Sequence, residues 1–139
     1  MSNNPILGAG GLHHVALKTK DWAATLRFYD VVLGFSIRVA WGDAPARAAY
    51  LDAGDGSCVE VFEDLGYSPS PNGAIPHFCL RTTRLDIVCE RARASGARIT
   101  MEPKDAVLHS TNGVGPKSIR LCFFDGPNGE SIELLQNAP

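Results

Sequence analysis

The residue types most able to do chemistry in this chain occur twice, at matched places in its two halves. Residues 14–19 (HVALKT) are matched by residues 77–82 (HFCLRT), and residues 55–60 (DGSCVE) are matched by residues 128–133 (NGESIE). Each half thus has one histidine at the start of a strand-like run and one glutamate in a later run. Imidazole nitrogen and carboxylate oxygen suit Zn²⁺, Ni²⁺, Co²⁺, Mn²⁺ or Fe²⁺. The repeat therefore predicts one divalent transition-metal site, with the ligands His14, Glu60, His77 and Glu133.

The alternation of side chains along a strand places both glutamates opposite apolar neighbours. Glu60 lies between Val59 and Val61, and Glu133 has the same setting between Ile132 and Leu134. Burial of a carboxylate among such neighbours is costly unless the group is paired or bound to a metal. A single histidine is more often structural, and a single glutamate more often pairs with an arginine. The matched set of both favours a metal site.

The elements that position these residues also repeat. Asp21 is a good helix N-cap after the first strand, and Gly34 ends that helix. In the second half Thr83 is the expected N-cap, with Asp86 three residues later, and Gly96 ends the helix. Further strands are expected at residues 35–41 and 47–52 in the first half and at 97–101 and 117–124 in the second, with an irregular, lid-like loop at 102–116.

These elements predict an α+β fold made of two strand-helix-strand-strand-strand modules in tandem. A chain of 139 residues suits a single domain, which we place at residues 11–136, after a flexible N-terminal tail at 1–10. Module one spans about 11–65 and module two about 76–136, with a linker rich in proline and glycine between them. Each module is too small to bury its sheet well, so we expect the modules to pair or to exchange across a homodimer.

Composition excludes several classes of partner. The formal net charge of −2 gives no basis for binding nucleic acid or an anionic membrane. No basic-then-apolar leader and no apolar run of membrane-spanning length are evident, so we expect a cytoplasmic protein. The four cysteines form no C-x-x-C pair, and we expect them to be buried, reduced thiols.

Three segments resemble the vicinal oxygen chelate superfamily, which contains glyoxalase I, extradiol dioxygenases and bleomycin-resistance proteins. They are residues 12–17 (LHHVAL), 27–35 (RFYDVVLGF) and 125–134 (DGPNGESIEL), and the resemblance extends from Gly11 to Gln136. It implies two βαβββ modules whose sheets curl around a metal site, with the helices outside. It also implies a small-molecule ligand and a dimer, which commonly places the site between modules.

Within the superfamily, the four predicted ligands fall where glyoxalase I has its metal ligands. The resemblance implies a metal-dependent lyase or isomerase, similar to lactoylglutathione lyase, that shifts a proton through an enediolate of a hemithioacetal or another α-oxygenated small molecule. Glu133 is then the expected general base, and Glu60 a ligand or second proton carrier. Lys18, Arg81 and Phe62 are the expected substrate contacts. Lys18 and Asp64 differ from the residues that hold glutathione in glyoxalase I, which leaves the thiol open.

Three alternatives remain. Transfer of a thiol to an antibiotic such as fosfomycin would need a K⁺-supporting loop, which is not evident in this sequence. A bleomycin-resistance-like protein would sequester a ligand without turnover and would need no metal. An Fe²⁺ extradiol dioxygenase would need two histidines, one glutamate and open positions for O₂, which a fourth protein ligand would reduce.

Overall fold

A computed structural model describes residues 5–6, 12–69, 77–111 and 113–137. The predicted tail at 1–10 lies outside these ranges except for residues 5 and 6, and so does most of the predicted linker. Among the described residues, no helix has the length and apolar character needed to cross a membrane.

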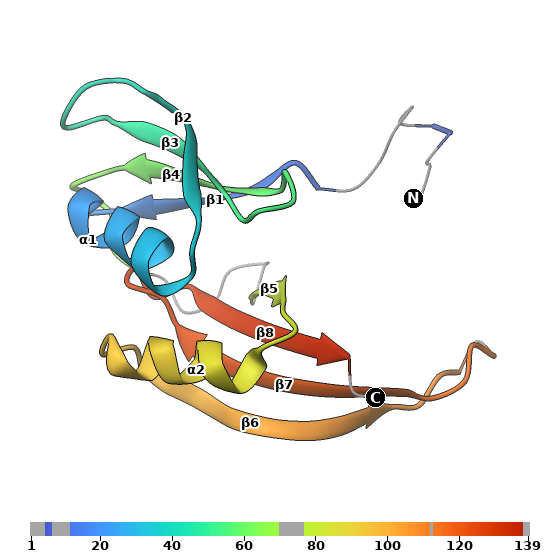
Figure 1. The fold of residues 1–139 in the computed structure, drawn as a ribbon. Coiled ribbons are helices and arrows are strands. Elements are labelled where there is room, and N and C mark those ends of the chain that lie inside the picture. The colour runs from blue at the N-terminus through green and yellow to red at the C-terminus, as the bar shows by residue number, and fades with distance from the viewer. Residues whose placement is uncertain (1–4, 7–11, 70–76, 112, 138–139) are drawn as a thin grey trace.

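The first module forms a four-stranded sheet with one helical segment (Figure 1). Strand β1 pairs in parallel with β4, and β3 pairs antiparallel with both β4 and β2, which gives the order β1-β4-β3-β2. The Asp21 side chain accepts a hydrogen bond from the Ala24 amide at 3.0 Å, which confirms it as the helix cap. The elements are β1 (His14–Thr19), α1 (Trp22–Arg27), the π-helical turn η1 (Phe28–Val32), β2 (Ser36–Trp41), β3 (Ala48–Asp52) and β4 (Cys58–Glu63).

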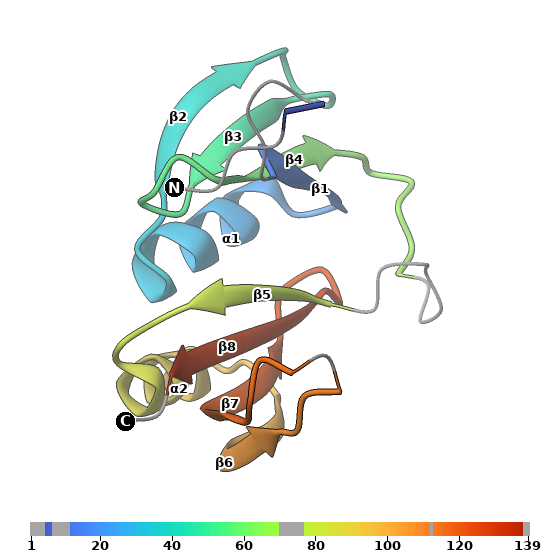
Figure 2. The same ribbon diagram turned by 90° about the vertical axis from the view of Figure 1, so that its right-hand side faces the viewer.

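The second module repeats this topology with the strand order β5-β8-β7-β6. Its elements are β5 (Phe78–Arg81), α2 (Leu85–Ala94), β6 (Ile99–Leu108), β7 (Lys117–Asp125) and β8 (Ser131–Asn137). Strands β1 and β5 are the edges that lie toward the other module (Figures 1 and 2). The tandem α+β arrangement predicted from the sequence is confirmed.

Two local predictions in the second module are wrong. Helix α2 begins at Leu85 after Arg84, and no side chain of the cap residue is used. The Leu85 amide donates instead to Gln136 Oε1 at 2.9 Å, so a residue distant in sequence replaces the predicted Thr83 cap.

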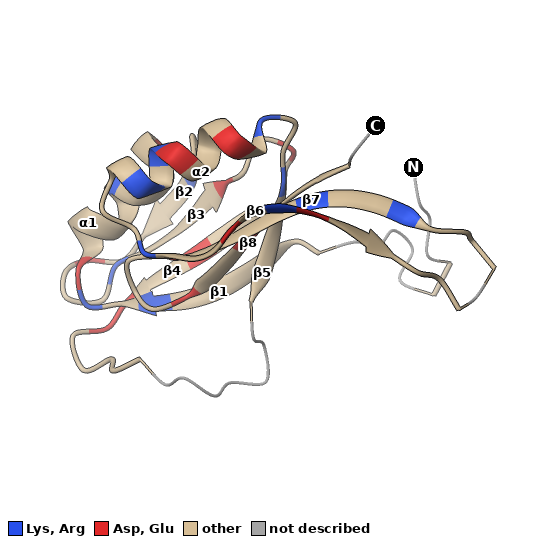
Figure 3. Cartoon of the chain, turned by 90° about the horizontal axis from the view of Figure 1, so that it is seen from below, with Lys and Arg blue, Asp and Glu red and all other residues tan. Residues whose placement is uncertain are grey.

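The first part of the predicted loop at 102–116, residues 102–108, is strand. Strand β6 continues to Leu108, which pairs with Lys117 of β7, and the register shifts between Met101 and Lys104. That irregularity accommodates Pro103, which has no amide to donate. The result is a long hairpin arm that extends beyond the rest of the second sheet (Figures 1 and 3).

One apolar core joins the two modules. Helices α1 and α2 lie on the same side of the two sheets (Figure 3), and Arg91 of α2 donates to the Val31 carbonyl of η1 at 2.7 Å. The core is continuous across this contact, so each module buries the sheet of its neighbour as well as its own. Its fully buried members include Tyr29, Leu51, Val61, Leu85, Cys89, Phe124, Ile132 and Leu134.

A polar network also crosses between the modules. The Tyr29 hydroxyl donates to Glu130 Oε2 at 2.9 Å, and the Asn128 amide donates to Glu130 Oε1 at 2.7 Å. The Asn128 side chain reaches back to the Thr25 hydroxyl at 2.9 Å. Gly126 packs so closely that a Cβ there would overlap the Glu130 side chain. Burial, opposed by these donors, raises the pKa of Glu130 above the usual glutamate value.

The raised pKa predicts a pH-dependent stability that Glu130→Gln should remove. The folded protein retains a proton on Glu130 at pH values where the unfolded chain has lost it, so this contribution is complete below the unfolded pKa and is lost as pH rises through the folded pKa. Urea titrations at about pH 5 and about pH 8 should therefore give a smaller decrease in unfolding free energy for Glu130→Gln than for the wild type. Glu90→Gln, at an exposed position on α2, is the matched control and should behave like the wild type. Equal decreases in Glu130→Gln and the wild type would contradict the prediction.

Candidate metal centre

The first predicted pair, His14 and Glu60, comes together on the sheet face that points away from the core. His14 Nε2 lies 3.2 Å from Glu60 Oε1. Val59 and Val61 are buried on the opposite face of β4, as strand alternation requires. The Glu60 side chain is only 9% exposed, so its carboxylate depends on the partners that surround it. We name this pair and its neighbours half-site one.

The second pair repeats this geometry in module two. His77 immediately precedes β5, and its Nε2 lies 3.0 Å from Glu133 Oε2. Ile132 and Leu134 are buried on the other face of β8. The Glu133 side chain is 13% exposed. We name this pair and its neighbours half-site two.

An aromatic ring stands beside each histidine, and sequence reasoning missed both rings. The Tyr50 ring of β3 lies 5.3 Å from the His14 ring, and the Phe123 ring of β7 lies 5.1 Å from the His77 ring. Tyr50 is in register with Glu60, and Phe123 is in register with Glu133. Local sequence carries no signal for this placement, because cross-strand register depends on how the hairpins pair.

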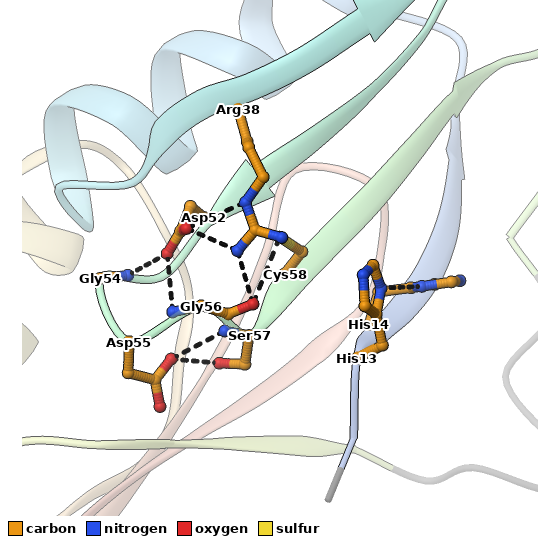
Figure 4. A network of polar contacts seen from close by, with 9 residues as sticks. All are labelled: His13, His14, Arg38, Asp52, Gly54, Asp55, Gly56, Ser57 and Cys58. Atoms are coloured by element: carbon orange, nitrogen blue, oxygen red, sulfur yellow. Dashed lines mark hydrogen bonds and ion pairs between the residues drawn. The ribbon is translucent and has the colours of Figure 1, made fainter. Parts of the chain in front are cut away.

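His13 also contacts half-site one, although strict alternation of side chains with His14 would turn it to the opposite face. Its Nδ1 lies 2.9 Å from the Nδ1 of His14 (Figure 4). His13 precedes the first residue of β1, so strand alternation does not govern its direction. The contact places His13 where it can accept a proton from His14 Nδ1 or donate one to it.

A network of hydrogen bonds stabilises the turn between β3 and β4. Arg38 donates to Asp52 Oδ2 at 2.6 Å and to the Gly56 carbonyl at 2.5 Å (Figure 4). Asp52 Oδ1 accepts in turn from the Gly54 amide at 2.7 Å. The Arg38 hydrogen bond is the main reason that the pKa of Asp52 lies below its usual value. This network stabilises the turn that precedes β4, the strand that carries Glu60.

Cys79 is exposed, which contradicts the prediction that every cysteine is buried. It follows His77 by two residues, shares its face, and is in register with Glu133. Although the residue as a whole is exposed, partial burial of its thiol, followed by the negative charge of Glu133, raises the pKa of Cys79 to about 11. The other three cysteines, Cys58, Cys89 and Cys122, are buried and free as predicted.

The three predicted substrate contacts divide between the modules. Lys18 Nζ lies 3.4 Å from Asp64 Oδ2 in an exposed ion pair. Phe62 is in register with Lys18 and is 38% exposed. Arg81 lines an open cleft of about 950 Å³ between the modules, together with Cys79. Lys18 and Phe62 therefore accompany half-site one, and Arg81 accompanies half-site two.

The two half-sites do not merge within one chain. Across the described residues, no three histidine, cysteine, aspartate or glutamate side chains gather closely enough to hold a metal ion. Each half-site offers one imidazole and one carboxylate, whereas a protein-bound transition metal takes about four or more ligands. One chain thus presents two separate pairs, each of one histidine and one glutamate.

Comparison with known proteins agrees with this architecture. The model of the Glyoxalase/Bleomycin resistance protein/Dioxygenase superfamily matches residues 11–134. An uncharacterised protein of Bacillus subtilis, YwbC, is 26% identical over 90% of this chain and 96% of its own length. The lactoylglutathione lyase of Haemophilus influenzae is 25% identical over 89% of this chain and 90% of its own length.

Solved structures share the fold. The trypanothione-dependent glyoxalase I of Leishmania major superimposes with a TM-score of 0.69 at 18% identity, covering 91% of this chain and 86% of the other. The duplicated modules, their strand order and the family match over most of the sequence lead to one conclusion. The chain belongs to the Glyoxalase/Bleomycin resistance protein/Dioxygenase superfamily.

Proposed function

We propose that this protein is a metal-dependent lyase or isomerase of the glyoxalase I type, whose site forms between two subunits. In each site, His14 and Glu60 of one subunit would meet the partner's His77 and Glu133 around one divalent transition metal. The observation that carries the proposal is the repeated pairing of an imidazole and a carboxylate, at 3.2 and 3.0 Å, on outward sheet faces.

The donor atoms present fit such a metal. In each pair the histidine Nε2 and a glutamate oxygen lie side by side, 3.2 and 3.0 Å apart, and both atom types are ligands that divalent transition metals take in proteins. A histidine that binds through Nε2 commonly donates its Nδ1 proton to an acceptor. His13 Nδ1, 2.9 Å from His14 Nδ1, can be that acceptor in half-site one.

Exposed apolar residues on the same face support the proposed dimer. Trp41, Val39 and Phe62 are all more than a third exposed. Val39 is in register with Tyr50, which is in register with Glu60. Trp41 is in register with Ala48, which is in register with Phe62. All three exposed residues therefore lie on the sheet face of Glu60. The Trp41 ring also contacts Tyr50, at 5.1 Å between centroids. An apolar cluster beside a polar pair is typical of a surface that another protein covers. A second copy would cover it and supply the missing ligand pair.

The chemistry is a proton shift between neighbouring carbons of an α-oxygenated substrate. The metal, when bound, supplies Lewis-acid stabilisation of negative charge on the substrate oxygens. Glu133 takes the proton from the carbon that bears the sulfur and hydroxyl groups, leaving its electron pair in an enediolate, and the proton is then delivered to the adjacent carbon. The hydroxyl of the first carbon also loses its proton and becomes the carbonyl of a thioester, while the former carbonyl oxygen gains a proton, so no external oxidant or reductant is consumed. Glu60 would act as a metal ligand on the other face of the substrate.

The residues around half-site one favour a thiol with a tail other than that of glutathione. Lys18 is neutralised by Asp64, so the pair offers little net positive charge to the carboxylates of a glutathione tail. Arg81 carries its charge into the intermodule cleft. The proposed substrate class is a hemithioacetal of an α-ketoaldehyde.

The function is tested by metal content and turnover measured together. The purified protein should bind about one transition-metal ion per chain, and chelation should abolish conversion of methylglyoxal hemithioacetals, with recovery on adding metal back. A panel of thiols that includes glutathione identifies the preferred adduct. Absence of bound metal, with tight binding of a ligand that is not turned over, would replace the proposal with a sequestering protein. Oxygen uptake with catechols and Fe²⁺ would replace it with a dioxygenase.

Glu133→Gln should reduce kcat about 10²- to 10⁴-fold, because an amide cannot accept the carbon-bound proton. Glu90→Gln is the control for charge loss at a position remote from the site. Steady-state rates should be compared at saturating metal, so that a change in metal affinity does not enter kcat. Turnover within twofold of the wild type would remove Glu133 from the role of base.

Mixed dimers test whether two chains build each site. His14→Ala and His77→Ala should each inactivate the protein when alone. A heterodimer of the two variants should recover about half of the wild-type activity, since one of its two sites then contains all four ligands and the other lacks both histidines. Sites built within single chains predict no recovery, because every site would then retain one defect. Co-purification through two different affinity tags isolates the heterodimer.

A further inference from the structure

The two half-sites are alike in their ligands but differ in their neighbours. In half-site one, Glu60 is flanked in the sheet by Tyr50 on β3 and Ala16 on β1. In half-site two, Glu133 is flanked by Phe123 on β7 and Cys79 on β5. The duplication makes these positions equivalent, so each difference can be compared directly.

The neighbours give the two carboxylates different hydrogen-bond donors. Tyr50 is in register with Glu60 on the same sheet face, which places its phenol beside that carboxylate. The Tyr50 ring also packs against both His14 and His13, at 5.3 and 5.4 Å between centroids. Phe123 packs against His77 in the same way but has no hydroxyl. The Cys79 thiol is the protic group nearest in the strand register to Glu133, and it also faces the Leu80 carbonyl at 3.8 Å. A thiol is a weak donor, so it holds a carboxylate less firmly than a phenol does.

Packing strengthens this contrast. Tyr50 is half-buried, and its ring is held between the histidines on one side and Trp41 on the other. A phenol packed in this way stands beside Glu60, and a hydrogen bond from such a neighbour to a ligand carboxylate would orient that carboxylate toward a metal. Glu133 has only an aromatic edge and a thiol beside it, and its side chain is slightly more exposed than that of Glu60.

We propose that Tyr50 is a positioning residue that fixes Glu60 as a permanent ligand, and that Phe123, by lacking the hydroxyl, leaves Glu133 free to exchange protons. This inference rests on the proposed function, because it assigns unequal roles to two carboxylates of the same site. Tyr50 and Phe123 stand at equivalent positions and differ by one oxygen atom. In this proposal that atom decides which glutamate is the base.

Exchanging the hydroxyl between the half-sites tests the inference. Tyr50→Phe should weaken the binding of Zn²⁺ about tenfold, measured by competition with a chromophoric chelator, while kcat at saturating metal stays within about threefold. Phe123→Tyr should leave Zn²⁺ affinity unchanged or tighter and should lower kcat about tenfold without raising KM, because the added phenol restrains the base. Visible spectra of the Co²⁺ form should change in Tyr50→Phe, since the orientation of a ligand carboxylate is altered.

Two controls separate positioning from a loss of folding. Tyr67→Phe removes a tyrosine hydroxyl that donates to the Asn128 carbonyl, at 3.2 Å, and should change neither Zn²⁺ affinity nor kcat. Adding Tyr50→Phe to a Glu60→Gln background should have a smaller effect on Zn²⁺ affinity than adding it to the wild type, because the two residues act together.

The outcomes distinguish the inference from the proposed function. If the wild type binds no metal and turns over no hemithioacetal, both are overturned. If the wild type does both, but Tyr50→Phe leaves Zn²⁺ affinity within twofold or Phe123→Tyr leaves kcat within twofold, the inference alone is overturned. Equal effects of Tyr50→Phe on the wild type and on Glu60→Gln would also overturn it.

Discussion

A carboxylate in the middle of a strand, with the apolar core on the other face, is the constraint around which this molecule is built. Glu60 and Glu133 are nearly buried, so each must have partners that compensate for lost water. The nearest partner in both modules is a histidine from the adjacent parallel strand or from the residue before it. The parallel pairing of β1 with β4, and of β5 with β8, is therefore what creates the two half-sites.

The same core that stabilises the modules keeps their half-sites apart. Helices α1 and α2 meet on one side of the sheets, and a continuous apolar core with the Tyr29–Glu130 bridge joins the modules there. The faces that carry the two histidine–glutamate pairs are consequently left open on the other side, and the face of module one also has exposed apolar neighbours such as Trp41. A second copy of the chain is the proposed means of completing both sites at once, and the burial of those neighbours would contribute to its stability.

Duplication supplies matched pairs of histidine and glutamate, and the residues beside the two pairs have diverged. Tyr50 and Phe123 occupy equivalent positions, each against the histidine of its own module. The two positions differ by one hydroxyl, and the unequal roles proposed for the two carboxylates rest on that difference. Roles within a symmetric site can therefore separate through small changes in the residues that touch the ligands.

Much of this protein was predictable from local sequence pattern. Periodicity and turn chemistry depend only on neighbours in the chain. They predict the tandem modules, the sheet faces of Glu60 and Glu133, the Asp21 cap and the strand at Lys117–Asp125. Three other features could not be predicted in this way, because each depends on residues or register set elsewhere in the fold. They are the cap of α2 by Gln136, the extension of β6 to Leu108 and the contact of His13 with His14. The sequence by itself determined which residues are paired as donors. Only the tertiary structure decided that the pairs stand apart in one chain and that Tyr50 lies beside one of them, since helix packing and strand register are properties of the assembled fold.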